Sequence, residues 1–117
     1  MIANTILLTK IQGEITTNSN KEKIGKWRDS MDRSLASLHF QKIHNKKLQI
    51  SLKFWIRKER LQNRKNDLDN LTKPVLDSMK RIGMIEDDAF IYHLEVSKYP
   101  TYGEEEVQLV IKEWRNF

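Results

Sequence analysis

The residues best suited to chemistry are acidic and lie in two pairs in the second half of the chain. Asp67 and Asp69 are two residues apart, and Asp87 and Asp88 are adjacent. In an extended segment a spacing of two sends both side chains to the same side, so Asp67 and Asp69 would repel each other unless a cation lay between them. Three or four carboxylates that meet would make an oxygen-rich site for Mg²⁺, with Mn²⁺ as a substitute.

These acids also have an ordinary structural interpretation. An Asp before a helix is commonly an N-cap, and adjacent Asp residues in a turn are commonly solvated. Lys73 follows Asp69 by four residues, so it could be one partner of an i,i+4 ion pair, or it could reach a scissile phosphate or a leaving oxygen. The spacing alone leaves both alternatives open.

A basic segment directly precedes the first acidic pair. Residues 57–65 hold five cations and one acid, a local charge of +4, in a chain whose net charge is +5 and whose pI is about 9.5. Such a segment can hold a polyanion while a metal neutralises the acids and activates water, which favours a functional site. The predicted DNA-binding residues are Arg57, Lys58, Arg60, Arg64 and Lys65.

The composition limits the class of protein. A length of 117 residues suits one domain, and the absence of cysteine excludes a disulfide framework, a thiol nucleophile and a zinc ribbon. The longest aliphatic run, residues 6–8, is too short to span a bilayer, and the first residues lack the regions of a signal peptide. The sequence therefore predicts a single soluble domain, 1–117, that acts in the cytoplasm without a membrane partner.

The first half of the chain predicts a strand, a helix and a second strand. Residues 6–12 have β character, and Gly13 is the expected stop. Ser19 begins a capping-box pattern, and an apolar stripe then predicts a helix that runs to about His39. Apolar and polar residues alternate over residues 48–57, which is the period of a strand with one buried face.

A second apolar stripe, over residues 68–82, predicts a second helix with Gly83 at its C-terminal stop. Pro74 complicates the start of this helix, because proline lacks an N–H and disfavours helical geometry at the residue before it. The first turn is therefore expected to be irregular, or to begin late, near Thr72.

The last third of the chain predicts two strands. Residues 90–98 alternate, residues 100–103 suggest a turn, and the apolar positions from Val107 to Ile111 mark a final strand. The two strands would form an antiparallel hairpin. The whole order is β-α-β-α-β-β, which predicts an α/β (α+β) fold: a small mixed four-stranded sheet with two helices packed on it.

The stretch 66–73, which reads NDLDNLTK, followed by Leu76-Asp77 and by Glu86-Asp87-Asp88, resembles the RusA family of Holliday-junction resolvases. The match is strong over residues 64–98 and extends to the rest of the chain by size and element order. The combination D-x-D-N-x-x-K followed by D-D is far more specific than any of its parts. Residues 13–18 depart from the family, because many members carry a proline-rich stretch after the first strand, so the resemblance does not extend to DNA contacts there.

The resemblance implies a Mg²⁺-dependent endonuclease that nicks four-way DNA junctions as a homodimer, in recombination and repair, and whose small members are often encoded by prophages. Asp67, Asp69 and Asp88 would be catalytic and metal-binding, and Lys73 would assist catalysis. Adjacent residues of an extended segment face opposite sides, so only one of Asp87 and Asp88 could join the first pair, and the resemblance selects Asp88.

A different class of function stays open. The same basic segment suits a non-catalytic nucleic-acid-binding protein whose acids only cap helices and face solvent. The discriminating observation is whether Asp67, Asp69 and Asp88 converge and bind a divalent ion.

Overall fold

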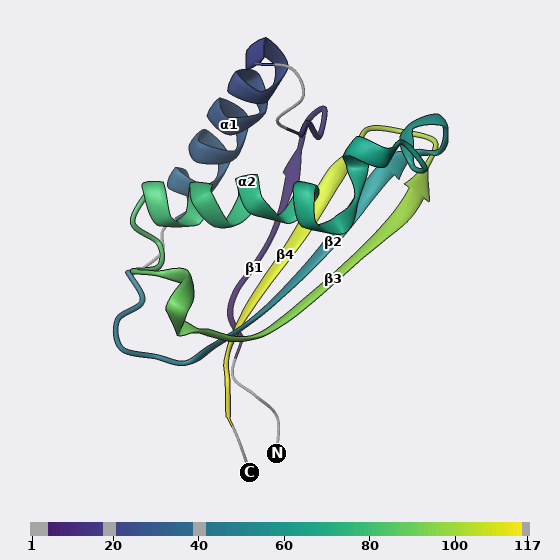
Figure 1. Ribbon diagram of the computed structural model, residues 1–117. Coiled ribbons are helices and arrows are strands. Elements are labelled where there is room, and N and C mark those ends of the chain that lie inside the picture. The colour runs from purple at the N-terminus through teal and green to yellow at the C-terminus, as the bar shows by residue number, and fades with distance from the viewer. Residues whose placement is uncertain (1–4, 18–20, 39–41, 116–117) are drawn as a thin grey trace.

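The computed structural model describes residues 5–17, 21–38 and 42–115, and it has the predicted element order (Figure 1). The helices and strands are β1 (Thr5–Gln12), α1 (Lys21–Ala36), β2 (Leu48–Arg57), α2 (Leu68–Arg81), β3 (Ile91–Thr101) and β4 (Glu106–Glu113). Short 3₁₀ turns span Lys58–Arg60, Arg64–Asn66 and Asp88–Phe90. The predicted cap at Ser19 and helix end at His39 lie outside the described residues.

The four strands form one mixed sheet in the order β1-β4-β2-β3. β2 and β3 are parallel and are joined by α2, whereas β4 is antiparallel to both β1 and β2. The predicted hairpin of the last two strands is therefore wrong, because β2 lies between them. The inward side chains of β4, such as Leu109, are fully buried, as suits a strand with a neighbour on each side.

Pro100 lies inside β3 rather than in the predicted turn. β3 is an edge strand, and an edge tolerates proline because one of its sides needs no ladder hydrogen bonds.

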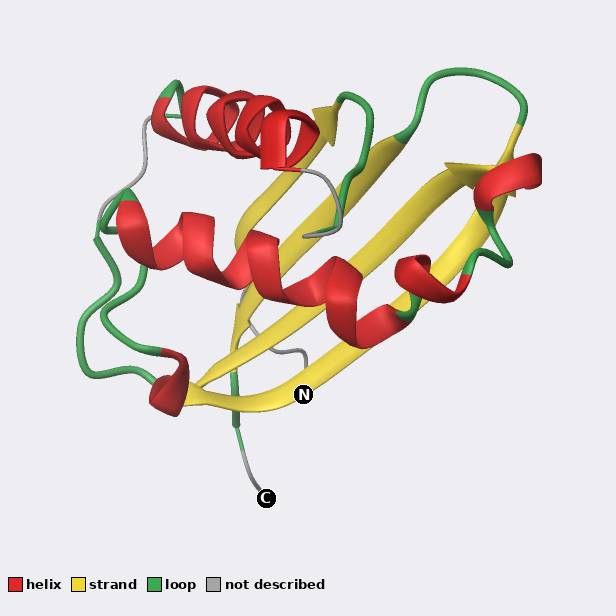
Figure 2. Ribbon diagram, turned by 45° about the horizontal axis from the view of Figure 1, so that its top comes forward, coloured by secondary structure: helices red, strands yellow, loops and turns green. Residues whose placement is uncertain are grey.

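Both helices pack on one face of the sheet (Figure 2). The predicted alternation of β2 is confirmed: Leu48, Ile50, Leu52, Phe54 and Ile56 are all buried on the helix side. The apolar stripes of both helices pack on this face of the sheet and complete the core. Their buried apolar residues are Ile24, Trp27, Met31, Leu35, Leu71, Val75 and Met79. Burial of this apolar surface is the main stabilising contribution to the fold.

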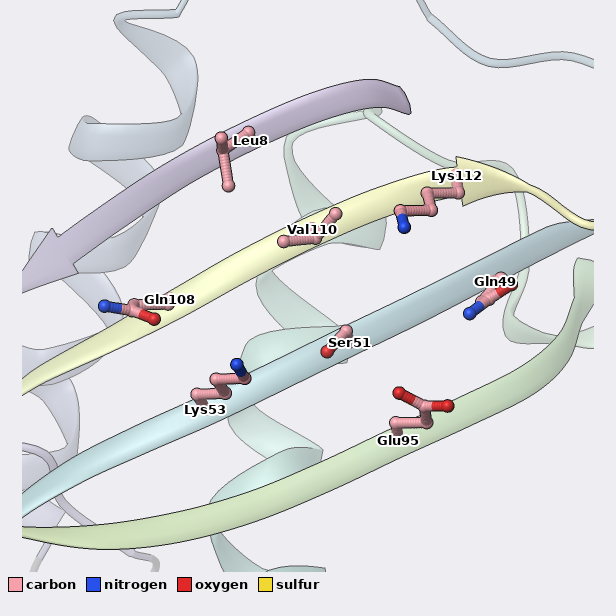
Figure 3. Close-up of a pocket in the computed structure, with 8 residues that line it drawn as sticks. All are labelled: Leu8, Gln49, Ser51, Lys53, Glu95, Gln108, Val110 and Lys112. Atoms are coloured by element: carbon pink, nitrogen blue, oxygen red, sulfur yellow. The ribbon is translucent and has the colours of Figure 1, made fainter. Parts of the chain in front are cut away.

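The opposite face of the sheet carries a shallow hollow of about 330 Å³ with mostly polar walls (Figure 3). Lys53 of β2 and Lys112 of β4 point into it, and Glu95 of β3 stands at its rim. On the same face Trp55 stacks on Tyr99, with ring centroids 4.7 Å apart.

Gly13 ends β1, as predicted, and it does so by packing against α1. Its φ of +150° is unfavourable for other residues, and an added Cβ would lie 3.1 Å from the ring of Trp27. Glycine at this position therefore lets the segment after β1 run close beside α1.

α2 begins at Leu68, so the expectation of an irregular or late start is wrong. Asp67 caps the helix: its Oδ1 accepts the Asn70 N–H at 2.8 Å, and its carbonyl accepts the Leu71 N–H at 3.0 Å. Such a cap contributes about 0.5–2 kcal/mol, which offsets part of the cost of roughly 3 kcal/mol for Pro74 inside the helix. The helix stops before Gly83, whose φ is +79°, as predicted.

Candidate active site

Asp67 and Asp69 stand at the start of α2, and both are exposed. Asp67 has an extended backbone as the N-cap, and Asp69 lies in the first helical turn. Negative charge is favourable at this position, because the N–H groups of the first turn carry the positive end of the helix dipole. Because Asp67 uses Oδ1 for its cap, its Oδ2 is the oxygen left for another ligand.

Lys73 lies one turn further along α2 and pairs with Asp69. Its Nζ is 3.6 Å from Oδ2 of Asp69, and the two side chains are 64% and 78% exposed. An exposed i,i+4 pair of this kind contributes only about 0.3–0.5 kcal/mol. The lysine is therefore not held in place by the pair, and its ammonium group can move to a phosphate beside the same acids.

Asp87 and Asp88 lie before β3, where Asp87 has an extended backbone and Asp88 begins a 3₁₀ turn. Asp87 caps the turn by accepting the Ala89 N–H at 3.1 Å, and Asp88 is the first residue of the 3₁₀ turn. Asp88 itself contacts Lys80, with 3.5 Å between Oδ2 and Nζ.

The structure does not bring the two acidic pairs together within one chain. Lys80, the contact of Asp88, follows Asp69 by eleven helical residues, which is a rise of about 16 Å. Figures 1 and 2 show the turn before β3 at the end of α2 opposite to its start. Within the described ranges no three acidic or imidazole side chains converge as a metal site. The reason is topological, because α2 carries the chain back along the sheet and β3 begins where α2 ends.

Two of the five predicted DNA-binding residues make internal contacts. Arg60 forms an ion pair with Glu105, which is 4% exposed, and its Nη2 donates to the Ile15 carbonyl at 2.6 Å. The backbone N–H of Arg57 donates to Glu105 at 2.9 Å, and its guanidinium lies 3.8 Å from Glu59. Arg60 therefore links the segment after β2 to Glu105 and to the segment after β1.

The other three predicted DNA-binding residues face solvent. Lys58, Arg64 and Lys65 are exposed, and none of them forms an ion pair with any residue that the structure describes. They lie on the two 3₁₀ turns that lead into Asp67. A row of uncompensated cations beside carboxylates suits a phosphate backbone that runs past the acids.

A family model described as endodeoxyribonuclease RusA matches residues 9–112. The chain belongs to the RusA endodeoxyribonuclease family. Its members are Holliday-junction resolvases, so membership implies nuclease activity on such junctions. A search of curated proteins finds no match to the chain.

RusA nucleases are metal-dependent in general, and the donors at the start of α2 are consistent with this. Mg²⁺ and Mn²⁺ prefer hard oxygen ligands, and Mg²⁺ is often held by one or two carboxylates together with water and substrate phosphate. Asp67 and Asp69 offer exposed carboxylate oxygens of this kind. Asp88 of the same chain is too far away to complete the set.

Two further residues shape this RusA site from the inner side of the basic segment. Asn66 is 5% exposed, and its Nδ2 donates to the Arg60 carbonyl at 2.9 Å. Lys98 of β3 donates from Nζ to the carbonyls of Leu61, at 2.9 Å, and Asn66, at 3.0 Å. These hydrogen bonds fix the end of the basic segment and so determine the position of Asp67.

The sequence held a signal for Lys98, which is the single cation among seven acids in residues 84–106. It held none for Glu105, which lies within a run of three glutamates and is distinguished only by its burial. In the described part of this RusA chain, neither helix is long and apolar enough to cross a membrane.

Proposed function

We propose that this chain resolves four-way DNA junctions by paired nicks, in a Mg²⁺-dependent reaction for which Mn²⁺ is a substitute, during DNA recombination and repair. The observation that carries the proposal is the arrangement of charges where the basic segment meets the start of α2. There the exposed pair Asp67 and Asp69, with Lys73 one turn on, directly follows the uncompensated cations Arg64 and Lys65. Carboxylates that face a phosphate-binding surface repel their substrate unless a metal joins them.

Each residue has a proposed role. Asp67, Asp69 and Asp88 hold the metal, which when bound supplies charge neutralisation and an activated water. Lys73 donates a hydrogen bond to the scissile phosphate or to the leaving oxygen, because its exposed ammonium group is free to leave Asp69. The cations of the basic segment hold the DNA backbone in place.

We further propose that the active form is a two-fold homodimer, and the separation of the acids within one chain supports this. Asp67 and Asp69 lie at one end of α2, and Asp88 lies at the other. Two copies that pack with their α2 helices antiparallel would bring the partner subunit's Asp88 to Asp67 and Asp69. The same two-fold axis would form two such sites, one for each of the paired nicks.

The deciding experiment is a nicking assay on a synthetic four-way junction and on a linear duplex, with Mg²⁺ and with EDTA. We expect nicks on the junction with Mg²⁺ only. Asp69→Asn should abolish cleavage while junction binding persists or tightens, because one negative charge near the phosphates is removed. Asp77→Asn is the matched control, because Asp77 is an exposed acid of the same helix that pairs with Lys80 at 3.6 Å.

Cleavage by Asp69→Asn near the wild-type rate would contradict the metal-site assignment. Junction binding by the wild-type protein without nicks in any divalent ion would instead support the alternative, a non-catalytic nucleic-acid-binding protein. We also propose that residues 1–117 act as one endonuclease domain in the cytoplasm, where the DNA substrate would lie, and that a prophage is the source of the gene.

A further inference from the structure

Two hollows on the helix side of the molecule adjoin each other. One has a volume of about 300 Å³ and reaches from Lys65 and Asn66 to the segment after β1, and the other, of about 340 Å³, continues from there along α1. Glu14, Thr16 and Lys23 line both hollows, so they form one continuous depression, which we call the α1 groove.

The segment after β1, which lines the α1 groove through Glu14 and Thr16, is held in place by contacts with its neighbours. Gly13 packs against Trp27 so closely that an added Cβ would lie 3.1 Å from its ring. Ile15, two residues on, is 1% exposed, and its N–H donates to Glu105 at 3.2 Å while its carbonyl accepts from Arg60. The segment after β1 therefore lies in a set position between α1 and the basic segment.

The walls of the α1 groove are strongly basic. They include one acid, Glu14, and five cations, which are Lys23, Lys26, Arg33, Lys65 and Arg60, the last of them paired with Glu105. The cations of α1 follow Lys23 by three and ten residues, with Ser30 between them at seven, and these offsets place all four residues on one stripe of the helix. This stripe runs beside the buried apolar stripe, so it borders the body of the protein.

The ion pairs of these cations are weak enough to be exchanged. Lys23 lies 3.6 Å from Glu14, with side chains 58% and 51% exposed, and Lys26 lies 4.0 Å from Glu22, with side chains 79% and 84% exposed. Exposed pairs contribute about 0–1 kcal/mol. A phosphate that enters the groove can therefore replace either of these two pairs at little cost.

We propose that the α1 groove binds the phosphate backbone of a second arm of a branched DNA, and this inference rests on the proposed function. The groove begins at Lys65 and Asn66, directly before Asp67, and leads away from the candidate active site along α1. A linear duplex that lies across the acidic residues extends away from them as two collinear segments. A four-way junction has further arms that leave from the branch point. The groove thus discriminates branched from linear DNA through cations of α1, which lie outside the acidic motif of residues 66–73.

The size of the groove suits a backbone rather than a base. Lys23 and Arg33 are ten helical residues apart, about 15 Å along the axis, and duplex DNA carries one charge per roughly 1.7 Å of its axis. Several phosphates of one arm therefore lie within reach of the α1 cations. Such contacts are independent of base sequence and depend strongly on salt.

The test compares two triple variants that remove the same charge. The groove variant carries Lys23→Ala, Lys26→Ala and Arg33→Ala, all at exposed helical positions. The control variant carries Lys10→Ala, Lys53→Ala and Lys112→Ala on the opposite face of the sheet, where Figure 3 shows Lys53 and Lys112. Binding to a four-way junction and to a linear duplex is measured by fluorescence anisotropy in EDTA, from low to moderate salt.

For the groove variant we expect a loss of junction affinity of at least about tenfold and a salt slope that falls by about two to three units, near 0.9 for each lost phosphate contact. Its duplex affinity should change much less, so its preference for the junction should shrink. The control variant should keep the wild-type preference and slope. Circular dichroism confirms folding, and a variant with glutamine at the three positions replaces any alanine variant that fails to fold.

Equal junction affinity and slope in the groove and control variants would overturn the inference and leave the proposed function intact. Equal losses on junction and duplex would also overturn it, because the groove would then serve both substrates alike. A wild-type protein that does not prefer the junction at all would contradict the proposed function itself.

Discussion

Arg60 and the buried Glu105 form a partly buried ion pair that joins the basic segment to the start of β4. The same carboxylate accepts the backbone N–H groups of Ile15 and Arg57, at 3.2 and 2.9 Å. One acidic side chain therefore connects the segment after β1, the end of β2 and the residues that lead to Asp67. This arrangement makes the position of the candidate active site depend on Glu105.

Glu105→Ala should destabilise the protein by about 3–5 kcal/mol, because it leaves the Arg60 guanidinium and two backbone N–H groups without their acceptor. The free energy of unfolding in urea measures this effect. Glu104→Ala removes an exposed carboxylate one residue away and should change stability by less than about 0.5 kcal/mol. A similar, small loss in both variants would mean that Glu105 is not the anchor that its contacts indicate.

Arg64→Ala combined with Lys65→Ala should weaken DNA binding and lower the salt slope by about one unit for each lost phosphate contact, because neither side chain is neutralised by an ion pair within the described residues. Salt titrations of junction affinity give the slope. The control is Lys42→Ala with Lys46→Ala, two exposed cations outside both the basic segment and the α1 groove. An unchanged slope in the first variant would place the DNA elsewhere.

Asp69→Asn and Asp88→Asn should complement each other if the site is shared between two copies. In a mixed dimer one shared site then carries both substitutions, and the other carries neither. Mixing the two inactive proteins should therefore restore single nicks on a junction, whereas wild-type protein makes paired nicks. If each chain held its own complete site, every site in the mixture would carry a substitution and no activity would return.

The mass of the particle tests the same dimer independently. Light scattering should give about twice the chain mass of 14.0 kDa. A monomer that still makes paired nicks at working concentration would rule the dimer out.

The free energy of unfolding should decrease as the pH becomes acidic, because Asp32 of α1 binds residues of α2 through its carboxylate. Its carboxylate accepts two hydrogen bonds from Arg81, both at 2.8 Å, and one from Ser78. The hydrogen bond from Arg81 lowers the pKa of Asp32 below its ordinary value of 3.8. Because the unfolded chain then binds the proton more readily, the contribution of this pair is present above pH about 4 and is lost as the pH falls through the lowered pKa.

Asp32→Asn should therefore cost about 1–2 kcal/mol at neutral pH and less as the pH approaches 3. Urea unfolding at several pH values measures the difference between the two proteins. A constant difference down to pH 3 would show that Asp32 does not contribute through its charge.

The sequence by itself determined the local features of this protein. The alternation of apolar and polar residues over 48–57 predicts a strand with one buried face, and the apolar stripe over residues 68–82 predicts a helix with one apolar side. Such periods follow from backbone geometry over a few residues, so they do not need knowledge of distant partners. The motif NDLDNLTK likewise identified the family and placed Asp67, Asp69 and Lys73 together, because one helix start carries all three.

Only the tertiary structure decided which distant residues meet. β4 pairs with β2 and β1 and not with β3, although β3 directly precedes it in the sequence. Asp88 lies beside Lys80, far from Asp69, because a parallel crossover returns the chain to the far end of the sheet before the next strand begins. Arg60 forms an ion pair with Glu105, 45 residues away, although in the sequence it is only one of the five cations of the basic segment. Strand order, crossover direction and burial are set by packing of the whole chain, and no short-range pattern encodes them.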